Sequence, residues 1–563
     1  MSDEPGARGR WELPAAVGAA ALVAVSVLGW AWTTPETTLR GHLVEWQFWT
    51  LEVQFAIAAA ALVHQWPRVA AALGAGRRTW LAAAACALLC LGLTASVAPR
   101  TSRIFFDEQI YQAVGRSLAD TRLAQMCNEG TVEYGRLQCW SGEYSKQPYA
   151  YPYVLSLAYR AAGPAPWIAH AVNNLAAAAT VLVVFALTVL AYRSRASGIG
   201  AALVMAVVPM QLVWSNTGAS EPTAALACAL AVTAAFAFVR GPSTVALIWC
   251  AAATVFAASF RPECLLVVPL VLAVVLAGAR GEIGRPRFWW ILAGAAALGW
   301  NVVAHAIAVR HEPWGAVGER MSVSFVSANL RTNGLFYLWD ERFPALFTGL
   351  ALVAVLARSR TRATWAFVGY FALFWGVFLL FYAGSYDYGA DVRYSLMTYP
   401  PLAVLAGAGA AWTVQRFEGS VGAARAAAIG AGALLFHMLL YLPIVRAVGE
   451  EAWAARADVD FIERAVQAIP PNSIVLTHTP STLLLRGVNA AQTATATTGE
   501  ARVRGDLFSR YAGGVYLYWN FWCNVPDPAQ QVYCTAALDR FGHEIVREER
   551  VRTYRFVLYR LLP

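Results

Sequence analysis

The sequence predicts a polytopic α-helical membrane protein that carries a mixed α/β domain outside the membrane. Of its 563 residues, 58% are hydrophobic and only 14% are charged, whereas about 25% are charged in an average soluble domain. Apolar runs of about 20 residues, long enough to cross a bilayer core, recur between residues 13 and 442. The remaining residues, 446–563, return to a polar composition typical of a small soluble domain.

About thirteen apolar segments are predicted to cross the membrane. The first, from Leu13 to Trp32, is expected to be a membrane helix because it is long for a signal peptide and no cleavage site is clear. The segments are 13–32, 51–66, 80–98, 167–192, 197–214, 222–239, 244–260, 264–279, 288–308, 344–357, 364–382, 396–412 and 425–442.

The arginines alternate between the loops that join these segments. The loops on one side of the membrane hold most of the arginines. The short loops on the opposite side hold few, chiefly Arg40, Arg261 and Arg393. Basic loops stay in the cytoplasm, so we expect a cytoplasmic N-terminus, an external C-terminal domain and a location in the bacterial cytoplasmic (inner) membrane. The arginines of the cytoplasmic loops are Arg8, Arg10, Arg68, Arg77, Arg78, Arg193, Arg195, Arg240, Arg280, Arg285, Arg287, Arg358, Arg360, Arg362, Arg416 and Arg425.

The net charge of +9 does not indicate a nucleic-acid partner. The arginines flank apolar runs and form no basic face, so membrane lipids are the expected surroundings. The cytoplasmic loops are short and contain no phosphate-binding GxxxxGK[ST] motif. HExxH, GxSxG and a zinc-type Cys/His cluster are also missing. A substrate already present at the outer leaflet is therefore favoured over a cytosolic nucleotide sugar.

Two regions are predicted to form the domains. Residues 1–445 make the transmembrane domain, including an external loop, 99–166, with interfacial helices. Residues 446–563 make the external cap, for which the pattern predicts a helix in ADVDFIERAVQAI and strands in SIVLTHT, GGVYLYWNFWC, HEIVREERV and YRFVLYRLL.

Four of the nine cysteines lie in polar regions, as two close pairs. Cys127 and Cys139 share the first external loop, and Cys523 and Cys534 share the C-terminal region. Such pairs suggest disulfides in an oxidising compartment, with free thiols as the alternative.

Asp107 and Glu108 stand at the head of an amphipathic stretch in the loop 99–166. An ionised carboxylate at the membrane edge can act as a general base, and the alternative role is helix capping. Lys146, the only lysine, precedes a tyrosine-rich segment that contains Tyr149 and Tyr151. A lysine at headgroup level suits a lipid phosphate, although it can also snorkel.

Further charges interrupt apolar segments. Glu221 opens one predicted helix, and Arg261 and Glu263 break another. Charges at such depth usually face a cavity or a partner, so Arg261 either meets a phosphate or pairs with Glu263. Arg393 beside Tyr394 is a second candidate phosphate or sugar contact.

These motifs, in this order, resemble the GT-C superfamily of membrane glycosyltransferases. The similarity is greatest to the branch of protein O-mannosyltransferases and the lipid A aminoarabinose transferase. It rests on FFDEQIY, the Lys-x-Pro segment at 146–152, Glu221, the Arg-Pro-Glu break at 261–263 and the Arg-Tyr segment at 393–401. This chain places three helices before its acidic loop, whereas family members usually place one.

The resemblance implies an inverting transfer of a single sugar from a polyprenyl-phosphate donor to an acceptor of the cell envelope, which is a lipid, a polysaccharide or a protein. It implies that Asp107 is the base, with Glu108 and Glu221 orienting the acceptor or a cation. Candidate donor-phosphate ligands are Lys146, Arg261 and Arg393, and candidate substrate contacts are Tyr149, Tyr151, His311 and Tyr394. Neither the resemblance nor the residues decide whether a cofactor takes part; Asp107 and Glu221 are the candidate ligands of a divalent cation, Mg²⁺ or Mn²⁺.

Three other functions compete with this one. A polymerase or ligase with a polyprenyl-diphosphate donor would use external arginines and a histidine, for which His311 beside Arg310 is the candidate. A lipid-linked glycan flippase would explain charges in a cavity, although such transporters often contain internal repeats and none is evident. A non-catalytic protein could use its cap as a binding module.

Overall fold

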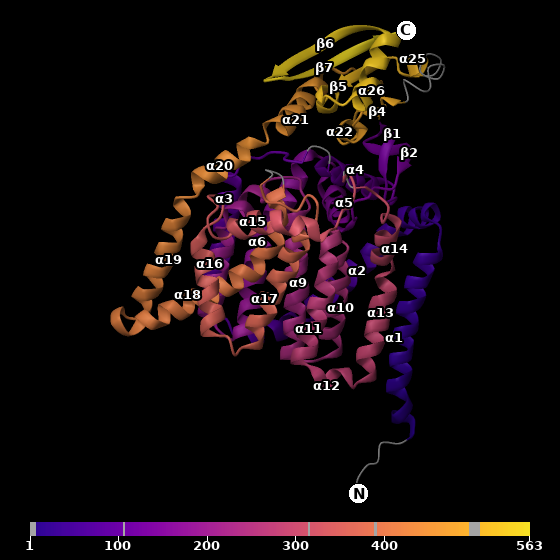
Figure 1. The fold of residues 1–563 in the computed structure, drawn as a ribbon. Coiled ribbons are helices and arrows are strands. Elements are labelled where there is room, and N and C mark those ends of the chain that lie inside the picture. Colours follow the sequence, from indigo (N-terminus) through magenta and orange to yellow (C-terminus); the bar gives the residue numbers. More distant parts are fainter. Residues whose placement is uncertain (1–6, 105–106, 314–315, 388–390, 495–506) are drawn as a thin grey trace. The chain divides into compact units, whose positions relative to one another are not determined.

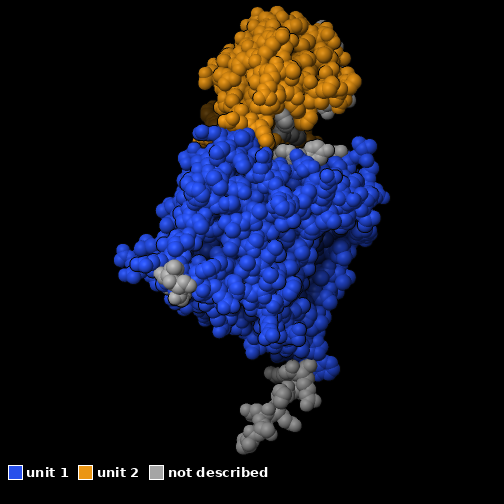
Figure 2. Space-filling view, turned by 60° about the vertical axis from the view of Figure 1, so that its left-hand side comes forward, with its two compact units in different colours: residues 1–99, 173–216, 220–449 blue, residues 100–172, 217–219, 450–563 orange. Residues whose placement is uncertain are grey.

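The computed structural model describes residues 7–104, 107–313, 316–387, 391–494 and 507–563. They form two compact units (Figure 2). Unit 1 comprises residues 1–99, 173–216 and 220–449, and unit 2 comprises residues 100–172, 217–219 and 450–563. The predicted division placed the loop 99–166 with the membrane helices, whereas the structure groups it with the C-terminal domain.

Unit 1 is helical (Figure 1). Seven helices of the described chain are long and apolar enough to cross a membrane, or nine if each of two bent pairs is one span. Each of the thirteen predicted segments coincides with a helix or a bent pair, while the number that cross the bilayer stays a prediction. The helices that contribute to this unit are α1 (Ala7–Thr33), α2 (Glu36–Leu73), α3 (Arg77–Ser96), α6 (Pro166–Tyr192), α7 (Arg195–Ala206), α8 (Pro209–Ser215), α9 (Glu221–Arg240), α10 (Thr244–Ala258), α11 (Val267–Gly278), α12 (Arg280–Ile283), α13 (Pro286–Leu298), α14 (Trp300–Ala308), α15 (Val326–Phe336), α16 (Ala345–Ala357), α17 (Arg362–Leu379), α18 (Tyr399–Val421), α19 (Ala423–Leu439) and α20 (Leu442–Glu451).

The arginine-rich loops of unit 1 are tied together at one end of its helices. Arg240, the last residue of α9, donates to the carbonyl of Leu190 near the end of α6 (2.6 Å). Arg287 in the first turn of α13 reaches the hydroxyl of Thr244 at the start of α10 (3.4 Å). Arg362, which begins α17, donates to a carbonyl in the last turn of α11 (2.9 Å). Three of the arginines predicted to share one side of the membrane, Arg240, Arg287 and Arg362, thus lie at one end of this unit.

A seven-stranded sheet organises unit 2, in the order β2-β1-β4-β3-β5-β7-β6. Its strands are β1 (Met126–Glu133), β2 (Arg136–Glu143), β3 (Ser473–Thr477), β4 (Asn489–Gln492), β5 (Gly514–Trp519), β6 (Gly542–Val551) and β7 (Tyr554–Leu562). The strands expected in the C-terminal domain are confirmed. The hairpin β1–β2 from the external loop pairs with β4, because it completes an otherwise open sheet edge, and this explains the different division of the chain.

Helices cover both faces of this sheet. Alternate residues of a strand face opposite sides, and Val475 accordingly packs with Phe461 of α21 (Trp453–Ala465). Ile474 and Leu476 pack on the other face with Ala537 of α26 (Pro528–Arg540). The remaining helices of the unit are α4 (Asp107–Asp120), α5 (Ala150–Ala162), α22 (Pro480–Leu484) and α25 (Phe508–Arg510).

Both predicted disulfides are confirmed. Cys127 and Cys139 join across the β1–β2 hairpin, and Cys523 joins Cys534, with Cα atoms 5.7 and 6.0 Å apart. All four cysteines belong to unit 2, and the five free cysteines of the chain (Cys86, Cys90, Cys228, Cys250 and Cys264) are buried in unit 1.

A buried carboxyl group in unit 2 generates a pH prediction. Asp458 of α21 accepts a hydrogen bond from the Tyr518 hydroxyl (2.6 Å), and burial raises its pKa from 3.8 to about 6. The folded state then holds a proton that the unfolded state releases. The stability from this proton is full below about pH 4 and is lost as the pH rises to 6, by about 3 kcal/mol.

Asp458→Asn should therefore flatten this part of the pH dependence, and the exposed Asp460→Asn on the same helix should not. Hydrogen exchange of the β5 segment in the full chain, at pH 4 to 7, measures the difference. An unchanged slope in Asp458→Asn would contradict the assignment.

Candidate functional site

Three breaks in the helices of unit 1 bring predicted site residues together. Glu221 is the first residue of α9. Arg261 immediately precedes the short 3₁₀ helix η1 (Pro262–Leu266), which separates α10 from α11. Arg393 and Tyr394 lie in a second 3₁₀ segment, η3 (Asp391–Thr398), directly before α18. Proline at 222 and 262 suits these first-turn positions, where no intrahelical partner for its missing N–H is needed.

The three charged side chains form a buried cluster around one carboxylate oxygen. Arg261 Nη1 lies 2.7 Å from Glu221 Oε1 and also donates to the Ser220 hydroxyl at 3.0 Å. Arg393 Nε lies 3.3 Å from the same Glu221 oxygen. Glu221 is 1% exposed and Arg261 is 8% exposed. The structure therefore brings Glu221, Arg261 and Arg393 together within unit 1, while their role in a site stays a prediction.

Arg261 also pairs with Glu263 through its Nε atom, as one of the two sequence alternatives predicted. The cluster thus contains two guanidinium groups and two carboxylates, and its formal charges cancel. Removing one member of such a buried set leaves its partners buried without a counter-charge, which lowers the free energy of unfolding by about 3–5 kcal/mol. The second oxygen of Glu221 is buried and receives no hydrogen bond from the described residues.

Tyr394 forms the aromatic wall of this cluster. Its ring stacks on Phe378 at 4.3 Å, with the planes 15° apart. The guanidinium carbons of Arg393 and Arg261 lie 5.0 and 5.8 Å from its centroid, within the range of cation–π attraction. The ring therefore helps to hold both arginines in place.

In unit 2, the buried carboxylate of Glu108 also holds several segments of the chain together. It is fully buried, and one carboxylate oxygen accepts the backbone N–H groups of Arg103 (2.6 Å) and Ile104 (2.9 Å). The other oxygen accepts the N–H of Gly218 at 2.7 Å. A Cβ at Gly218 would lie 3.0 Å from that oxygen, so glycine permits the close approach. These bonds assign Glu108 a positioning role.

Asp107 begins α4, as predicted, and is half-buried. This helix was expected to have one solvated face, but every residue from 108 to 118 is buried. Its polar face is used inside the unit: Gln109 accepts from the Thr482 hydroxyl, and Arg116 donates to the Leu484 carbonyl. The sequence pattern was amphipathic because one face of α4 binds α22 and not water.

Lys146 is half-buried in the turn before α5. Tyr149 closes this turn, because its hydroxyl accepts the Ser145 N–H at 2.7 Å. Tyr151 is fully buried and packs edge-on against Tyr111 of α4 at 5.5 Å. Both tyrosines thus have packing partners within unit 2, and their role as substrate contacts stays a prediction.

His311 joins a different group of residues. It is 70% exposed and lies 3.5 Å from Glu36, the first residue of α2. Glu36 and Glu312 both pair with Arg40, at 2.7 and 2.6 Å. The helix α2 begins 15 residues before the predicted segment 51–66, because these ion pairs neutralise the charges of its first turn.

The residues Ser220 and Gly218 were missed as site residues. Both belong to SNTGASEP, in which a small-residue stretch precedes a helix-opening acid. That signal favours a tight backbone approach, but it does not name the partner. For a divalent cation, the donor set at Glu221 fits poorly, since two guanidinium groups already lie within 3.3 Å of its one oxygen. A cation at Asp107 stays a prediction.

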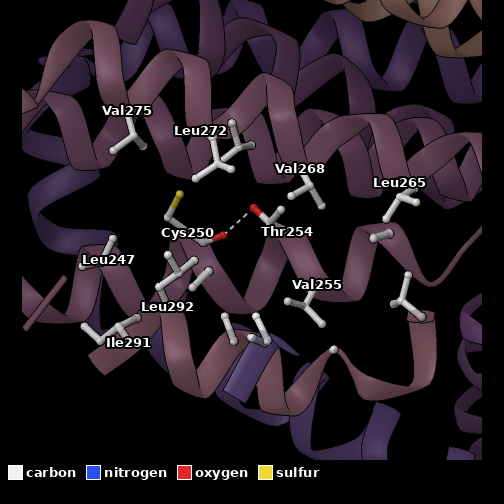
Figure 3. Close-up of a pocket in the computed structure, with 18 of the residues that line it drawn as sticks. Leu247, Cys250, Thr254, Val255, Leu265, Val268, Leu272, Val275, Ile291 and Leu292 are labelled. Carbon is white, nitrogen blue, oxygen red and sulfur yellow. Dashed lines mark hydrogen bonds between the residues drawn. The ribbon is translucent and has the colours of Figure 1, made fainter. Parts of the chain in front are cut away.

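An apolar cavity of about 310 Å³ lies elsewhere in unit 1, between α1, α10, α11, α13 and α14 (Figure 3). Leu272, Val255 and Leu292 are among its lining residues, and the Thr254 hydroxyl donates to the Cys250 carbonyl at 2.7 Å. Such a lining suits hydrocarbon and offers no charged group for chemistry.

No protein-family model matches the sequence, and no curated protein matches it. Among solved structures, ArnT from Cupriavidus metallidurans in the apo state is similar, with a TM-score of 0.53 and 15% identity over 86% of this chain and 98% of ArnT. ArnT is the lipid A aminoarabinose transferase, a GT-C superfamily member. This chain has the GT-C fold.

Two further structures are similar to this chain. ArnT bound to undecaprenyl phosphate gives a TM-score of 0.52 at 16% identity, covering 86% of this chain and 98% of ArnT. The oligosaccharyltransferase AglB from Archaeoglobus fulgidus, in complex with an inhibitory peptide and a dolichol-phosphate, gives 0.49 at 12% identity, covering 85% of this chain and 74% of AglB. The resemblance predicted from the motifs is confirmed at the level of the fold.

The role of Glu108 is testable by hydrogen exchange. Glu108→Gln replaces one accepting oxygen by an NH₂ group, which leaves a buried backbone N–H without an acceptor at a cost of about 1–3 kcal/mol. We expect roughly 10- to 100-fold faster exchange at residues 103, 104 or 218. Glu143→Gln, an exposed acid of the same unit, is the control and should leave these rates unchanged. Equal rates in both variants would contradict the positioning role.

Proposed function

We propose that this chain is an inverting glycosyltransferase that moves a single sugar from a polyprenyl-phosphate donor to a cell-envelope acceptor at the outer face of the cytoplasmic membrane. The observation that carries the proposal is the fold shared with nearly the whole length of ArnT, which has been solved with undecaprenyl phosphate bound. The buried arginine cluster of unit 1 supports it, since arginine suits phosphate recognition.

The outer-face assignment has two supports. Glu221 and Arg240 are the two ends of α9, whose 20 residues span about 30 Å, the thickness of a bilayer core. The arginine-rich end of unit 1 then corresponds to the cytoplasm, and the Glu221 cluster to the opposite side. Both disulfides lie in unit 2, as expected of an oxidising compartment.

In the proposed reaction, the acceptor oxygen or nitrogen attacks the anomeric carbon of the donor sugar. Asp107 takes the acceptor's proton, and the bond from the anomeric carbon to the phosphate oxygen breaks. Its electron pair leaves with polyprenyl phosphate, and attack from the opposite side inverts the configuration. Negative charge gathers on the leaving phosphate, so Arg261, Arg393 and Lys146 are proposed to stabilise it electrostatically.

Glu221 has a distinct role in this proposal. In the structure it occupies both arginines, so the donor phosphate must share or replace its contact with Arg393. The ion pair of Arg393 with Glu221 is longer, at 3.3 Å, than that of Arg261 with Glu221, at 2.7 Å. A longer ion pair is more readily exchanged for a phosphate, so we assign Arg393 as the arginine that turns to the phosphate and Arg261 as the fixed one.

The reaction is tested with purified protein in nanodiscs and a panel of radiolabelled polyprenyl-phosphate sugars, with crude envelope as acceptor. Release of polyprenyl phosphate from one donor is expected, and Asp107→Asn should lower it by about 10²–10⁴-fold, as for loss of a general base. Glu143→Gln is the matched acid control. Retained binding of polyprenyl phosphate by Asp107→Asn shows that the variant is folded.

The other outcomes decide between functions. Turnover of diphosphate donors only, abolished by His311→Ala, would establish a polymerase or ligase. Transfer of a lipid-linked glycan across the bilayer without bond cleavage would establish a flippase. Loss of turnover in EDTA, restored by Mg²⁺ or Mn²⁺, would establish the divalent cation.

Arg393→Ala should raise the KM for the donor by about 10- to 100-fold, because that factor corresponds to the free energy of a hydrogen bond to a charged group. Its effect on folding should be smaller than that of Arg261→Ala. Arg342→Ala, which breaks an ion pair with Asp340 in the same unit (2.6 Å), is the control for loss of an arginine. An unchanged donor KM in Arg393→Ala would overturn this assignment.

A further inference from the structure

The C-terminal domain contains a second group of chemically capable side chains, at the carboxyl ends of its parallel strands. β4, β3 and β5 lie side by side and parallel, with β3 in the middle. His478 directly follows β3, and Cys523 lies in the 3₁₀ turn η6 (Phe521–Asn524) that follows β5. Cys534, from α26, completes the group. Neighbouring parallel strands end at the same edge, so residues that follow them converge there.

This edge is where the chain changes the face of the sheet that it covers. The connection from β3 to β4 passes through α22, whose Leu483 packs on the face that contains Val475. The connection that leaves β5, the other neighbour of β3, passes through α26, whose Ala537 packs on the opposite face with Leu476. In open α/β sheets, a strand pair whose connections diverge in this way leaves a crevice at its carboxyl ends, and ligands bind there.

The atoms in this place match a transition-metal donor set. The ring nitrogen of His478 and the sulfurs of Cys523 and Cys534 all lie within 4.8 Å of one another. Zinc bonds thiolate sulfur at 2.3 Å in tetrahedral geometry, which places two ligand sulfurs about 3.8 Å apart. Within the described part of the chain, these three residues are the one group of this kind.

The surroundings hold these donors in position. Cys523 and Cys534 are 2% and 1% exposed, while His478 is half-buried and its ring meets Tyr533 edge-on at 5.8 Å. Asn520 is fully buried at the end of β5, and its side-chain oxygen lies 3.6 Å from the Cys523 sulfur. Buried sulfurs beside a more accessible imidazole form a site with an entry from one side.

The disulfide must open before a metal can bind. A dithiol reductant transfers two electrons and two protons to the Cys523–Cys534 bond, giving two thiols and the oxidised, disulfide form of the reductant. Zn²⁺ then displaces the two thiol protons, which pass to solvent, and the neutral His478 ring nitrogen donates its lone pair. Water supplies the fourth ligand.

We propose that Cys523, Cys534 and His478 form a redox-gated Zn²⁺ site, closed while the disulfide is intact and opened when a dithiol reduces it. The second disulfide of the chain, Cys127–Cys139, provides an internal control. It lies within a β-hairpin and belongs to no comparable group of ligand atoms in the described chain. This inference does not rest on the proposed glycosyltransferase reaction.

The test is a Zn²⁺ titration of the purified full chain, against a competing chromophoric chelator, before and after reduction with a dithiol that is then removed. We expect one Zn²⁺ per reduced chain and none per oxidised chain. His478→Ala should weaken binding by more than about tenfold, because loss of a ligand exceeds loss of an outer-shell partner. Co²⁺ should give a thiolate charge-transfer band only in the reduced protein.

Matched variants keep the proposal falsifiable. Replacing Cys523 and Cys534 by serine should abolish Zn²⁺ binding after reduction, and replacing Cys127 and Cys139 by serine should preserve it. Circular dichroism and the retained second disulfide show that each variant is folded. Absence of binding in the reduced wild type, or equal binding in the Cys523→Ser/Cys534→Ser variant, would overturn the proposal.

Discussion

The ion pairs of Glu221 with Arg261 and Arg393 are the interaction on which the membrane unit depends. Each residue sits where a helix starts or is interrupted, and each would be costly to bury alone. Together they neutralise one another and fasten α9, η1 and η3 at a common point. Because breaking such a set costs about 3–5 kcal/mol, the interruptions in the helices are stable features and not weak points.

In the proposed reaction, this one cluster serves both folding and chemistry. Two cations held by carboxylates need no large rearrangement to meet a phosphate, since an anion already occupies the position. The nearly unexposed Glu221 holds both arginines in position through its ion pairs. Preorganised charge of this kind is what a reaction with an anionic leaving group requires.

In unit 2 a buried carboxylate is also satisfied by several donors, but these donors are backbone N–H groups and not arginines. The Glu108 carboxylate gathers three N–H groups from two segments distant in sequence. One of them, Gly218, precedes Glu221 by only three residues. The same short stretch of chain thus carries a contact that orders the unit containing Asp107 and a residue of the arginine cluster. Two disulfides and a sheet covered on both faces give this unit its rigidity.

The sequence by itself determined the elements whose signal is local. Apolar length specified the helices, short runs of apolar and aromatic residues specified the strands of the C-terminal domain, and polar cysteine pairs specified both disulfides. The family resemblance of its motifs also named Glu221, Arg261 and Arg393 as candidate site residues. These features follow from the cost of burying polar groups, which can be read position by position.

Only the tertiary structure decided which partner each charge takes and what each amphipathic face covers. Arg261 pairs with two acids, Glu108 accepts hydrogen bonds from three backbone N–H groups, and the polar face of α4 is buried against α22. The hairpin β1–β2 joins a sheet whose other strands begin more than 300 residues later. A sequence pattern records that a face is polar or that an edge needs pairing, but the partner comes from distant chain, and its identity is settled only when the chain folds.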